Sequence, residues 1–174
     1  MRHNPVEVNI INSSVQGSAL VFKSFKDHGK NVSQLVLTYS QLADLRRSSQ
    51  ELDQCDAVSV FELFLVHMPR LRHLGIHGTT EDPVILEYVE ISRIPQTLAL
   101  RLTSLDLTSC RFSSHEFQHL REFVNLTHLN LFDVKLFAPG VDTIEVFRSL
   151  QKLRYTSQPA FHTAMIFVLR KILL

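Results

Sequence analysis

Residues 102–112 read LTSLDLTSCRF, and residues 126–136 read LTHLNLFDVKL. Both stretches carry leucine at their first, fourth and sixth positions. The fourth and sixth positions are two apart, so their side chains lie on the same face of a β-strand. A pattern that returns in the same form further along the chain indicates a structural unit that is repeated.

Three other segments share the pattern. LQKLRYTSQPA begins at Leu150, as far beyond Leu126 as Leu126 is beyond Leu102, and has Tyr155 where the third leucine is expected. VSQLVLTYSQL begins at Val32 and LRHLGIHGT at Leu71, so the earlier units are longer than the later ones. Alternating apolar residues at positions 6, 8 and 10 predict one more strand near the N-terminus.

Helical patterns fill the intervals between these strands. Apolar residues recur mostly at i, i+3 and i+4 spacing, which indicates amphipathic helices. We expect Pro95 to end the helix that precedes Leu102, because proline cannot continue a helix. One unit cannot bury its strand and its helix alone, so neighbouring units must stack and share a core. The apolar helix residues are Ala19, Leu20, Val21, Phe22 and Phe25, then Leu52, Cys55, Val58, Phe61, Phe64 and Leu65, then Ile85, Leu86, Val89 and Ile91, then Ile144, Val146, Phe147 and Leu150.

The repeated strand, turn and helix resemble the leucine-rich-repeat family in its cysteine-containing type, with Cys110 at the ninth position of its unit. The resemblance implies an α/β leucine-rich-repeat solenoid of about five to six irregular repeats, with parallel strands on the concave face and helices on the convex face. It also implies a small, buried, structural thiol at Cys110.

We expect a single domain over residues 1–174, with an N-terminal capping unit at 1–30, repeats at 31–158 and a C-terminal helix at 159–174. That helix ends in three apolar residues, 172–174. It either caps the last repeat with its apolar side inward or belongs to a chain that continues into further helices, and the apolar ending favours the second interpretation.

Composition sets limits on the class of protein. A length of 174 residues with 45% apolar content suits one core, and the net charge of +1, from 18 basic and 17 acidic residues, gives no electrostatic reason to expect nucleic acid or an anionic membrane as partner. The start MRHNPVEVNII has no secretory apolar region, and the two cysteines form no disulfide framework. These features predict an intracellular protein, cytoplasmic or nuclear, with free thiols.

His115-Glu116-Phe117-Gln118-His119 spells H-E-x-x-H, the zinc-protease pattern. With Phe117 as the reference, a step of about 100° per residue puts Leu120 and Val124 within about 60° of it, as a buried stripe, and both histidines about 160° away, on the solvated side. A catalytic zinc needs a third protein ligand and a closed cavity, and neither is evident. We therefore expect no metal, no cofactor and no catalytic residues, and keep a zinc hydrolase built on His115, Glu116 and His119 as a remote alternative.

Alternation along the strands predicts which side chains face away from the core. The third positions are Gln34, His73, Ser104, His128 and Lys152; the fifth are Val36, Gly75, Asp106, Asn130 and Arg154; the seventh are Thr38, His77, Thr108, Phe132 and Thr156. Such a polar surface with a few aromatic rings is typical of protein recognition. Arg46, Arg47, Arg70, Arg72 and Arg101 lie off the strand centres, and we expect them to be ordinary solubilising charges. The predicted partner-binding residues are Gln34, Thr38, Tyr39, His73, His77, Asp106, Thr108, His128, Asn130, Phe132, Asp133, Lys152 and Arg154.

A closer resemblance is carried by the order of segments: ALVFKSFKDHG, then VSQLVLTYSQL, then long irregular repeats, then LTSLDLTSC from Leu102 and LTHLNLF from Leu126. This order is similar to the leucine-rich-repeat portion of the Zyg-eleven-type substrate receptors of cullin-2 ubiquitin ligases. The resemblance implies a substrate-receptor or adaptor role, with ligase components and a substrate as partners. Those receptors carry an elongin box with leucine four positions before its cysteine, whereas Glu51 and Asp106 stand there for Cys55 and Cys110.

Two function classes therefore remain beside the zinc alternative. The first is a non-catalytic protein-interaction module that acts as a ubiquitin-ligase adaptor. The second is a general leucine-rich-repeat scaffold or inhibitor with no link to a ligase. Neither class is expected to bind nucleic acid or a membrane.

Overall fold

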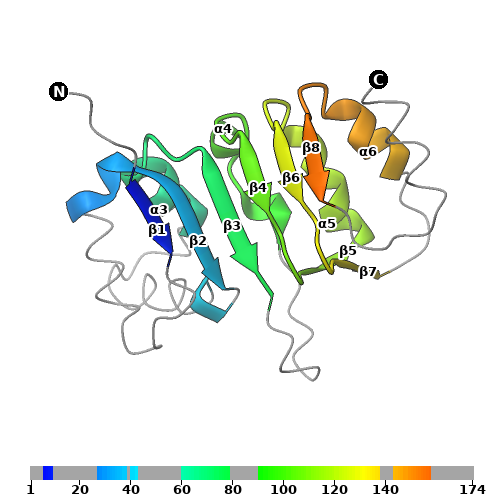
Figure 1. Ribbon diagram of the computed structural model, residues 1–174, viewed down its shortest axis with the longest axis horizontal. Coiled ribbons are helices and arrows are strands. Elements are labelled where there is room, and N and C mark those ends of the chain that lie inside the picture. Colours follow the sequence, from blue (N-terminus) through cyan, green and yellow to red (C-terminus); the bar gives the residue numbers. More distant parts are fainter. Residues whose placement is uncertain are drawn as a thin grey trace.

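The computed structural model of the protein describes residues 6–9, 27–38, 40–42, 60–78, 90–137 and 143–157. These residues form an α/β structure around a parallel sheet that is not closed into a barrel (Figure 1). The sheet has the strand order β1-β2-β3-β4-β6-β8, and every neighbouring pair runs parallel. The strands are β1 (Val6–Asn9), β2 (Val32–Thr38), β3 (His73–His77), β4 (Ser104–Asp106), β6 (His128–Asn130) and β8 (Tyr155–Ser157).

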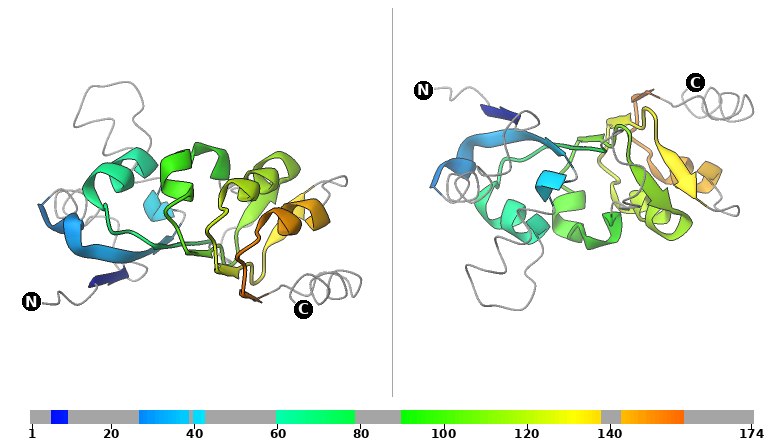
Figure 2. Two further views of the ribbon diagram at one scale, coloured as in Figure 1. Left: turned by 90° about the horizontal axis from the view of Figure 1, so that it is seen from above. Right: turned by 90° about the horizontal axis from the view of Figure 1, so that it is seen from below.

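Helices cover one face of this sheet, as the views from above and below show (Figure 2). Successive parallel strands can be joined only by a connection that crosses from the end of one strand to the start of the next. The described helices belong to these connections, and they all lie on one face of the sheet. A second, two-stranded parallel sheet follows the turns after β4 and β6, and the sequence patterns did not predict it. The helices are η2 (Gly29–Asn31), α3 (Val60–His67), η3 (Ile91–Arg93), α4 (Gln96–Ala99), α5 (Ser114–Gln118), η4 (His119–Glu122) and α6 (Thr143–Ser149); the second sheet pairs β5 (Arg111–Ser113) with β7 (Lys135–Phe137).

The pairing of residues between β3, β4 and β6 confirms the alignment of these strands that the leucine pattern predicts. Leu74 pairs with Leu105, and Leu105 pairs with Leu129 on the next strand. These three side chains are fully buried, and Leu107 and Leu131, which follow two positions later, are buried as well. Burying one leucine side chain stabilises a fold by about 1.5–3 kcal/mol, so this ladder of side chains is a main source of stability.

The helices complete the core from the other side. Phe64, Phe117 and Phe147 are buried, and the rings of Phe117 and Phe147 meet edge to face with centroids 6.2 Å apart. Val146 and Leu150 are buried as well, as the helical pattern before Leu150 predicts. The described strands and helices thus share one contiguous cluster of buried residues.

The last strand corrects the predicted frame. β8 pairs Thr156 with Leu129, and the N–H of Arg154 donates to the carbonyl of Thr127. The residue that corresponds to Leu126 is therefore Leu153, whereas the sequence pattern assigned Leu150 to that place. The error has a physical source, because a buried apolar residue also stands three positions before the first leucine of the earlier units, as Met68, Ala99 and Phe123 do. In the last unit that residue is Leu150, which therefore resembles the start of the strand frame.

The helical segment before Pro95 ends as predicted, because η3 ends at Arg93 and Ile94 is extended. Pro95 also stands at the N-cap of α4, where a proline costs no hydrogen bond. Another helix prediction needs correction. Val124 is 41% exposed, and Phe123 takes the predicted buried position. The chain tightens from α5 into the 3₁₀ turn η4, in which every third residue lies on the same side, so the position three after Leu120 faces inward.

Several predicted segments lie outside the described residues: the apolar pattern at 19–25, the first part of the pattern at 52–65 including Cys55, Ile85 to Val89, Tyr39, and the C-terminal helix at 159–174. In the described ranges, no helix combines the length and the apolar character needed to cross a bilayer.

Candidate functional site

The candidate site lies on the polar face, by which we mean the face of the main sheet opposite the helices. Strand pairing aligns the predicted third positions Gln34, His73, Ser104 and His128 in one row. The fifth positions Val36, Gly75, Asp106 and Asn130 form a parallel row. His128 is exposed, and Gln34, His73, Asp106 and Asn130 are partly exposed, so these rows reach solvent.

A network centred on Asp106 links two neighbouring strands at the carboxyl end of this face. The Oδ1 atom of Asp106 accepts a hydrogen bond from the Thr108 N–H at 3.0 Å and another from the Thr108 hydroxyl at 2.7 Å. The Oδ2 atom lies 3.3 Å from Nε2 of His77, a contact without the alignment of a hydrogen bond. The carboxylate is thereby held in one orientation between its own turn and the preceding strand.

The pKa of Asp106 reflects this network. Burial by itself would raise the pKa, but the contact with His77 and the two hydrogen bonds from Thr108 outweigh it and lower the pKa to about 2. The side chain therefore carries a full negative charge throughout the physiological range, although only 20% of it is exposed.

Asn130 repeats the role of Asp106 one unit later. Its Oδ1 accepts from the Phe132 N–H at 3.0 Å, as Asp106 accepts from the N–H of Thr108. Its Nδ2 donates to the Thr108 hydroxyl at 3.1 Å, which joins the two units. Asp and Asn side chains readily form such turns with the backbone two positions on. His77, Asp106, Thr108 and Asn130 thus form one connected polar cluster.

The turns after this cluster present a ring to solvent. Phe132 is 59% exposed, so its ring is accessible to a partner. The residue after it, Asp133, has φ 53°, and its counterpart Ser109 has φ 55°. The Ser109 hydroxyl contacts Asp133 Oδ2 at 3.2 Å. Two equivalent left-handed residues therefore set the direction of the chain at the edge of the cluster.

The alternation of side chains along the strands predicted that Thr38 and Val36 face away from the core, but in the structure both side chains are engaged within the chain. Thr38 caps the helical residues 40–42: its N–H donates to Gln41 Oε1 at 2.9 Å and its hydroxyl accepts from the Gln41 N–H at 3.3 Å. Val36 is buried rather than solvated, because its side chain fills the space above Gly75, where a Cβ atom would lie 2.9 Å from Val36 Cγ1.

Lys152 and Arg154 do not occupy the third and fifth positions of the last strand. The pairing of β6 with β8 places Tyr155 opposite His128 and Ser157 opposite Asn130. Lys152 lies in the turn before β8 and Arg154 directly before the strand. Both cations therefore belong to the amino end of the sheet, away from the Asp106 cluster.

The H-E-x-x-H segment has an evident structural role. The two carboxylate oxygens of Glu116 accept from the backbone N–H and the hydroxyl of Ser92, both at 2.8 Å, and so tie α5 to the preceding unit. The two histidine rings stack edge to face with centroids 5.0 Å apart. His115 is exposed as predicted, whereas Nδ1 of His119 contacts Glu122 at 2.7 Å. Within the described ranges, no three His, Cys, Asp or Glu side chains converge in a way suited to a metal ion.

Cys110 is buried, as predicted for a structural thiol. It is 1% exposed, and its Sγ donates to the carbonyl of Ile76 at 3.0 Å. Burial raises the pKa of the thiol to about 12, so the nucleophilic thiolate is not formed at neutral pH.

Sequence reasoning missed several contacts whose signals were present. Ser113 and Glu116 have capping-box spacing, and the Ser113 hydroxyl does cap α5 by accepting from the Glu116 N–H at 3.2 Å. Thr38 and Gln41 have the same spacing. Arg101 was predicted to be a solubilising charge, but its guanidinium donates to the carbonyls of Leu65 and Met68 at the end of α3. Its separation from that helix in sequence hid this contact.

Comparison of the sequence with protein-family models and with curated proteins gives no match. Function is therefore inferred from the geometry of the polar face and from the resemblances carried by the repeated segments.

Proposed function

We propose that the chain is a non-catalytic protein-interaction module, built as a leucine-rich-repeat solenoid, that serves as a substrate receptor or adaptor in a cullin-RING ubiquitin ligase. The observation that carries the interaction role is the polar cluster of His77, Asp106, Thr108 and Asn130 beside the exposed ring of Phe132. Aromatic side chains are enriched at protein interfaces, and polar groups already held in place lose little freedom when a partner binds beside them. Residues that pair between β4 and β6 are separated along the sequence by the same number of positions as residues that pair between β5 and β7. This equal separation supports the repeat architecture.

The ligase role rests on the resemblance of the segment order, and a general scaffold without a ligase link is the alternative. A zinc hydrolase is not proposed, because both oxygens of Glu116, the expected general base, are engaged by Ser92.

Affinity purification of the tagged chain from cells, followed by mass spectrometry, tests the proposal. Wild type should recover partner proteins that a His128→Ala, Phe132→Ala double variant loses, because both side chains are exposed on the polar face or its edge. The matched control is Val66→Ala, Gln118→Ala, which truncates two exposed residues on the helical side. Recovery of cullin and elongin components supports the ligase role, and specific partners without them support the scaffold. Equal recovery by both variants would reject the polar face as the interface.

A further inference from the structure

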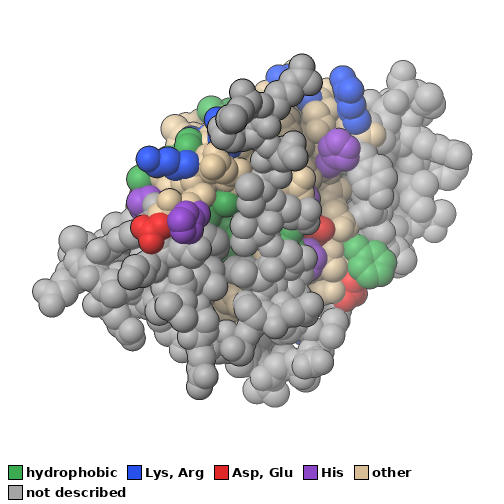
Figure 3. All heavy atoms as spheres, turned by 60° about the vertical axis from the view of Figure 1, so that its left-hand side comes forward, with side chains coloured by type: hydrophobic (Ala, Val, Ile, Leu, Met, Phe, Trp, Pro, Cys, Tyr) green, Lys and Arg blue, Asp and Glu red, His purple; other side chains and the backbone are tan. Residues whose placement is uncertain are grey.

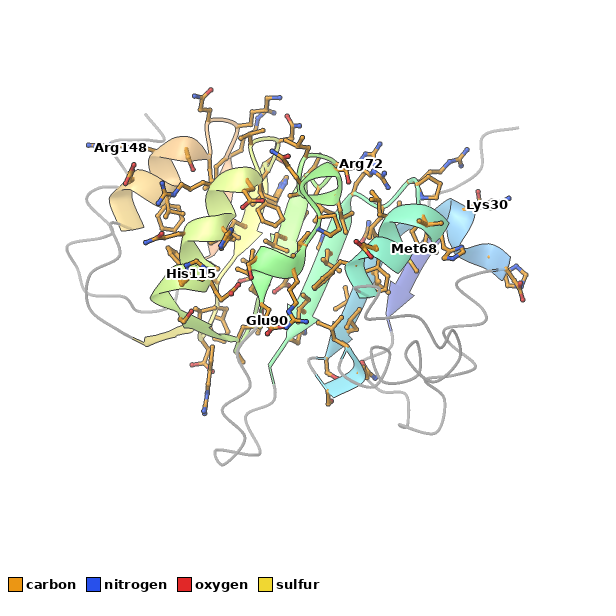
Figure 4. All side chains as sticks on the ribbon, turned by 180° about the vertical axis from the view of Figure 1, so that it is seen from behind. Lys30, Met68, Arg72, Glu90, His115 and Arg148 are labelled. Atoms are coloured by element: carbon orange, nitrogen blue, oxygen red, sulfur yellow. The ribbon has the colours of Figure 1, made fainter. Side chains whose placement is uncertain are left out.

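The basic side chains of the protein gather where the strands begin. Arg70 and Arg72 flank Leu71, where the β3 unit (71–101) begins, and Arg101 precedes Leu102, where the β4 unit (102–125) begins. Lys152 and Arg154 precede β8. We call these five residues the basic rim. Figure 4 shows Arg72 with Lys30 and Arg148 along one edge of the molecule and Glu90 toward the opposite edge. Asp106 and Asp133, which lie at the carboxyl ends of the strands, belong to that opposite side.

Hydrogen bonds place the strand-entry turns side by side. Arg70 donates to Asn31 Oδ1 of the preceding unit, and Arg101 to the carbonyl of Met68. Asn125 donates to the carbonyl of Leu100 at 2.7 Å, and Lys152 donates to Asn125 Oδ1. Each turn therefore reaches back to the turn before it. The turn before β6, residues 123–127, contains no Lys or Arg of its own. Because Lys152 reaches Asn125 in this turn, positive charge is present along this part of the edge as well.

The charge of the basic rim is not neutralised within the described part of the chain. None of the five cations forms an ion pair with a described carboxylate, and the hydrogen bonds they make go to neutral oxygens. Arg70, Arg72, Lys152 and Arg154 are exposed. Partial burial, and then the neighbouring charge of Arg72, lower the pKa of Arg101, which indicates that the two guanidinium groups repel each other. An anion bound here would relieve this repulsion.

The turns that carry the cations also expose apolar side chains. Leu100 and Val124 are each 41% exposed and occupy equivalent places in the turns before β4 and β6, directly before Arg101 and Asn125. Pro69 is exposed in the equivalent place before Arg70. In the space-filling view, Lys and Arg side chains lie along the upper part of the molecule, and Asp and Glu side chains lie below them (Figure 3).

We propose that the basic rim binds an extended peptide segment in which acidic and apolar residues are interspersed. Strands lie about 4.8 Å apart, so Arg72 and Arg154, three strands apart, are roughly 14 Å from each other. About four to five residues of an extended peptide span that distance. Its carboxylates meet the guanidinium groups, which suit them geometrically, and its apolar residues cover Leu100 and Val124.

This composition favours a peptide over a nucleic acid. Single strands are held by aromatic side chains on which the bases stack, whereas the large apolar side chains that are exposed in the strand-entry turns, Leu100 and Val124, are aliphatic. Phe132, the aromatic ring among the large exposed apolar residues described, lies at the other end of the strands. The basic rim is a different surface from the polar face, and peptide binding there does not depend on the proposed function.

Fluorescence anisotropy of the full chain tests the proposal with a fluorescein-labelled peptide of about 12 residues, long enough to span the rim, in which Glu alternates with Leu and Ser. The Glu peptide should bind, its Gln counterpart should bind at least tenfold more weakly, and added salt should weaken binding because it screens exposed charges. An Arg72→Gln, Arg154→Gln double variant should lose about five- to tenfold in affinity, as expected for two exposed charge contacts. Leu100→Ser, Val124→Ser should also weaken binding, but leave the salt dependence unchanged.

The matched control is Arg93→Gln, Arg111→Gln, which removes the same charge from η3 and β5 and should bind like wild type. Circular dichroism checks that each variant is folded. Equal loss in the control would mean that net charge alone attracts the peptide and would overturn the proposal. Tighter binding of a single-stranded RNA of equal charge, or of phosphatidylserine vesicles, would overturn it in favour of those partners, and so would failure of the Glu peptide to bind.

Discussion

At the scale of single residues, the structure assigns one task to two chemically different side chains. Asp106 and Asn130 occupy the same place in successive units, and each accepts a hydrogen bond from the backbone N–H two positions later. The difference lies in their neighbours: Asp106 has His77 at 3.3 Å, and Asn130 has the hydroxyl of Thr108. The turn therefore requires an acceptor at this position, while the charge at Asp106 is an addition specific to its unit.

This distinction predicts how stability depends on pH. The pKa of Asp106 is about 2 in the folded chain, below its ordinary value of 3.8, so its contribution is present above about pH 4 and is lost as the pH falls from 4 toward 2. After allowance for solvent screening, Asp106→Asn should lower the free energy of unfolding by about 1 kcal/mol at pH 6, and the difference from wild type should shrink by pH 3. Urea unfolding at both pH values measures it.

The control for this prediction is Asp133→Asn, which removes an exposed carboxylate from the next turn. A difference between wild type and Asp106→Asn that stays constant from pH 6 to pH 3 would contradict the role assigned to the charge.

At the scale of elements, the short helices are held in place by side chains that cross from one unit to the next. α5 has only five residues, too few to be stable alone, and it continues into a 3₁₀ turn. Its position is fixed by the Ser113 cap, by burial of Phe117 and by the double hydrogen bond from Ser92 to Glu116. The glutamate of the zinc-protease pattern is thus a structural residue of this helix.

A double-mutant cycle tests this role of Glu116. Ser92→Ala and Glu116→Ala should each lower the free energy of unfolding by about 1–2 kcal/mol, because hydrogen bonds to a charged group are lost. The double variant should lose less than the sum, with a coupling energy of about 1 kcal/mol. Gln118→Ala, on the exposed side of the same helix, is the control and should change stability by less than about 0.5 kcal/mol. Additive losses would show that the two side chains act independently.

At the scale of the whole molecule, stability comes from a core that runs continuously under the described strands. Leu74, Leu105 and Leu129 lie on three adjacent strands and are all fully buried. Phe64, Phe117 and Phe147 close the same cluster from the helical side. Units that share side chains in this way stabilise one another, so the described strands should unfold together.

Leu129→Ala tests this cooperativity. The substitution removes a fully buried side chain between β4 and β8 and should cost about 2–5 kcal/mol. Urea unfolding followed by circular dichroism should show one transition, shifted to lower urea with an unchanged slope. Phe132→Ala, which truncates an exposed ring, is the control and should cost less than about 1 kcal/mol. Two separate transitions in the Leu129→Ala variant would show that the units unfold independently.

Much of the α/β arrangement could be predicted from the sequence, because the leucine period reports directly which side chains share a face. The pairing of Leu105 with Leu129, the burial of Cys110 and the α6 pattern follow from that period. The frame of the last strand could not be predicted, because Leu150 and Leu153 fit the first and fourth positions of the pattern, whereas the frame that begins at Leu153 has Thr156 and Gln158 where leucines are expected. Only the pairing of Thr156 with Leu129 distinguishes them.

The polar face was less predictable than the core. Alternation identified Asp106, Asn130 and Phe132 as outward-facing, but it could not show that Val36 is covered or that Thr38 is engaged as a cap. The clustering of cations at the strand starts was also hidden. It depends on residues that are distant in sequence and become neighbours through intervals of unequal length.

The equal offset of the contacts between the β4 and β6 units bears on the history of the chain. Strand pairing in both sheets and the contact of Ser109 with Asp133 join positions separated by the same distance along the sequence. The tie from Ser92, before β4, to Glu116, after β4, spans the same distance one unit earlier. A tandem duplication that repeats residues 102–125 would therefore add one strand, one turn and one helix. The added unit would contact its neighbours through the same residue pairs that already join β4 to β6 and β5 to β7. We therefore predict that such an insertion would lengthen the sheet by one strand without compensating changes elsewhere.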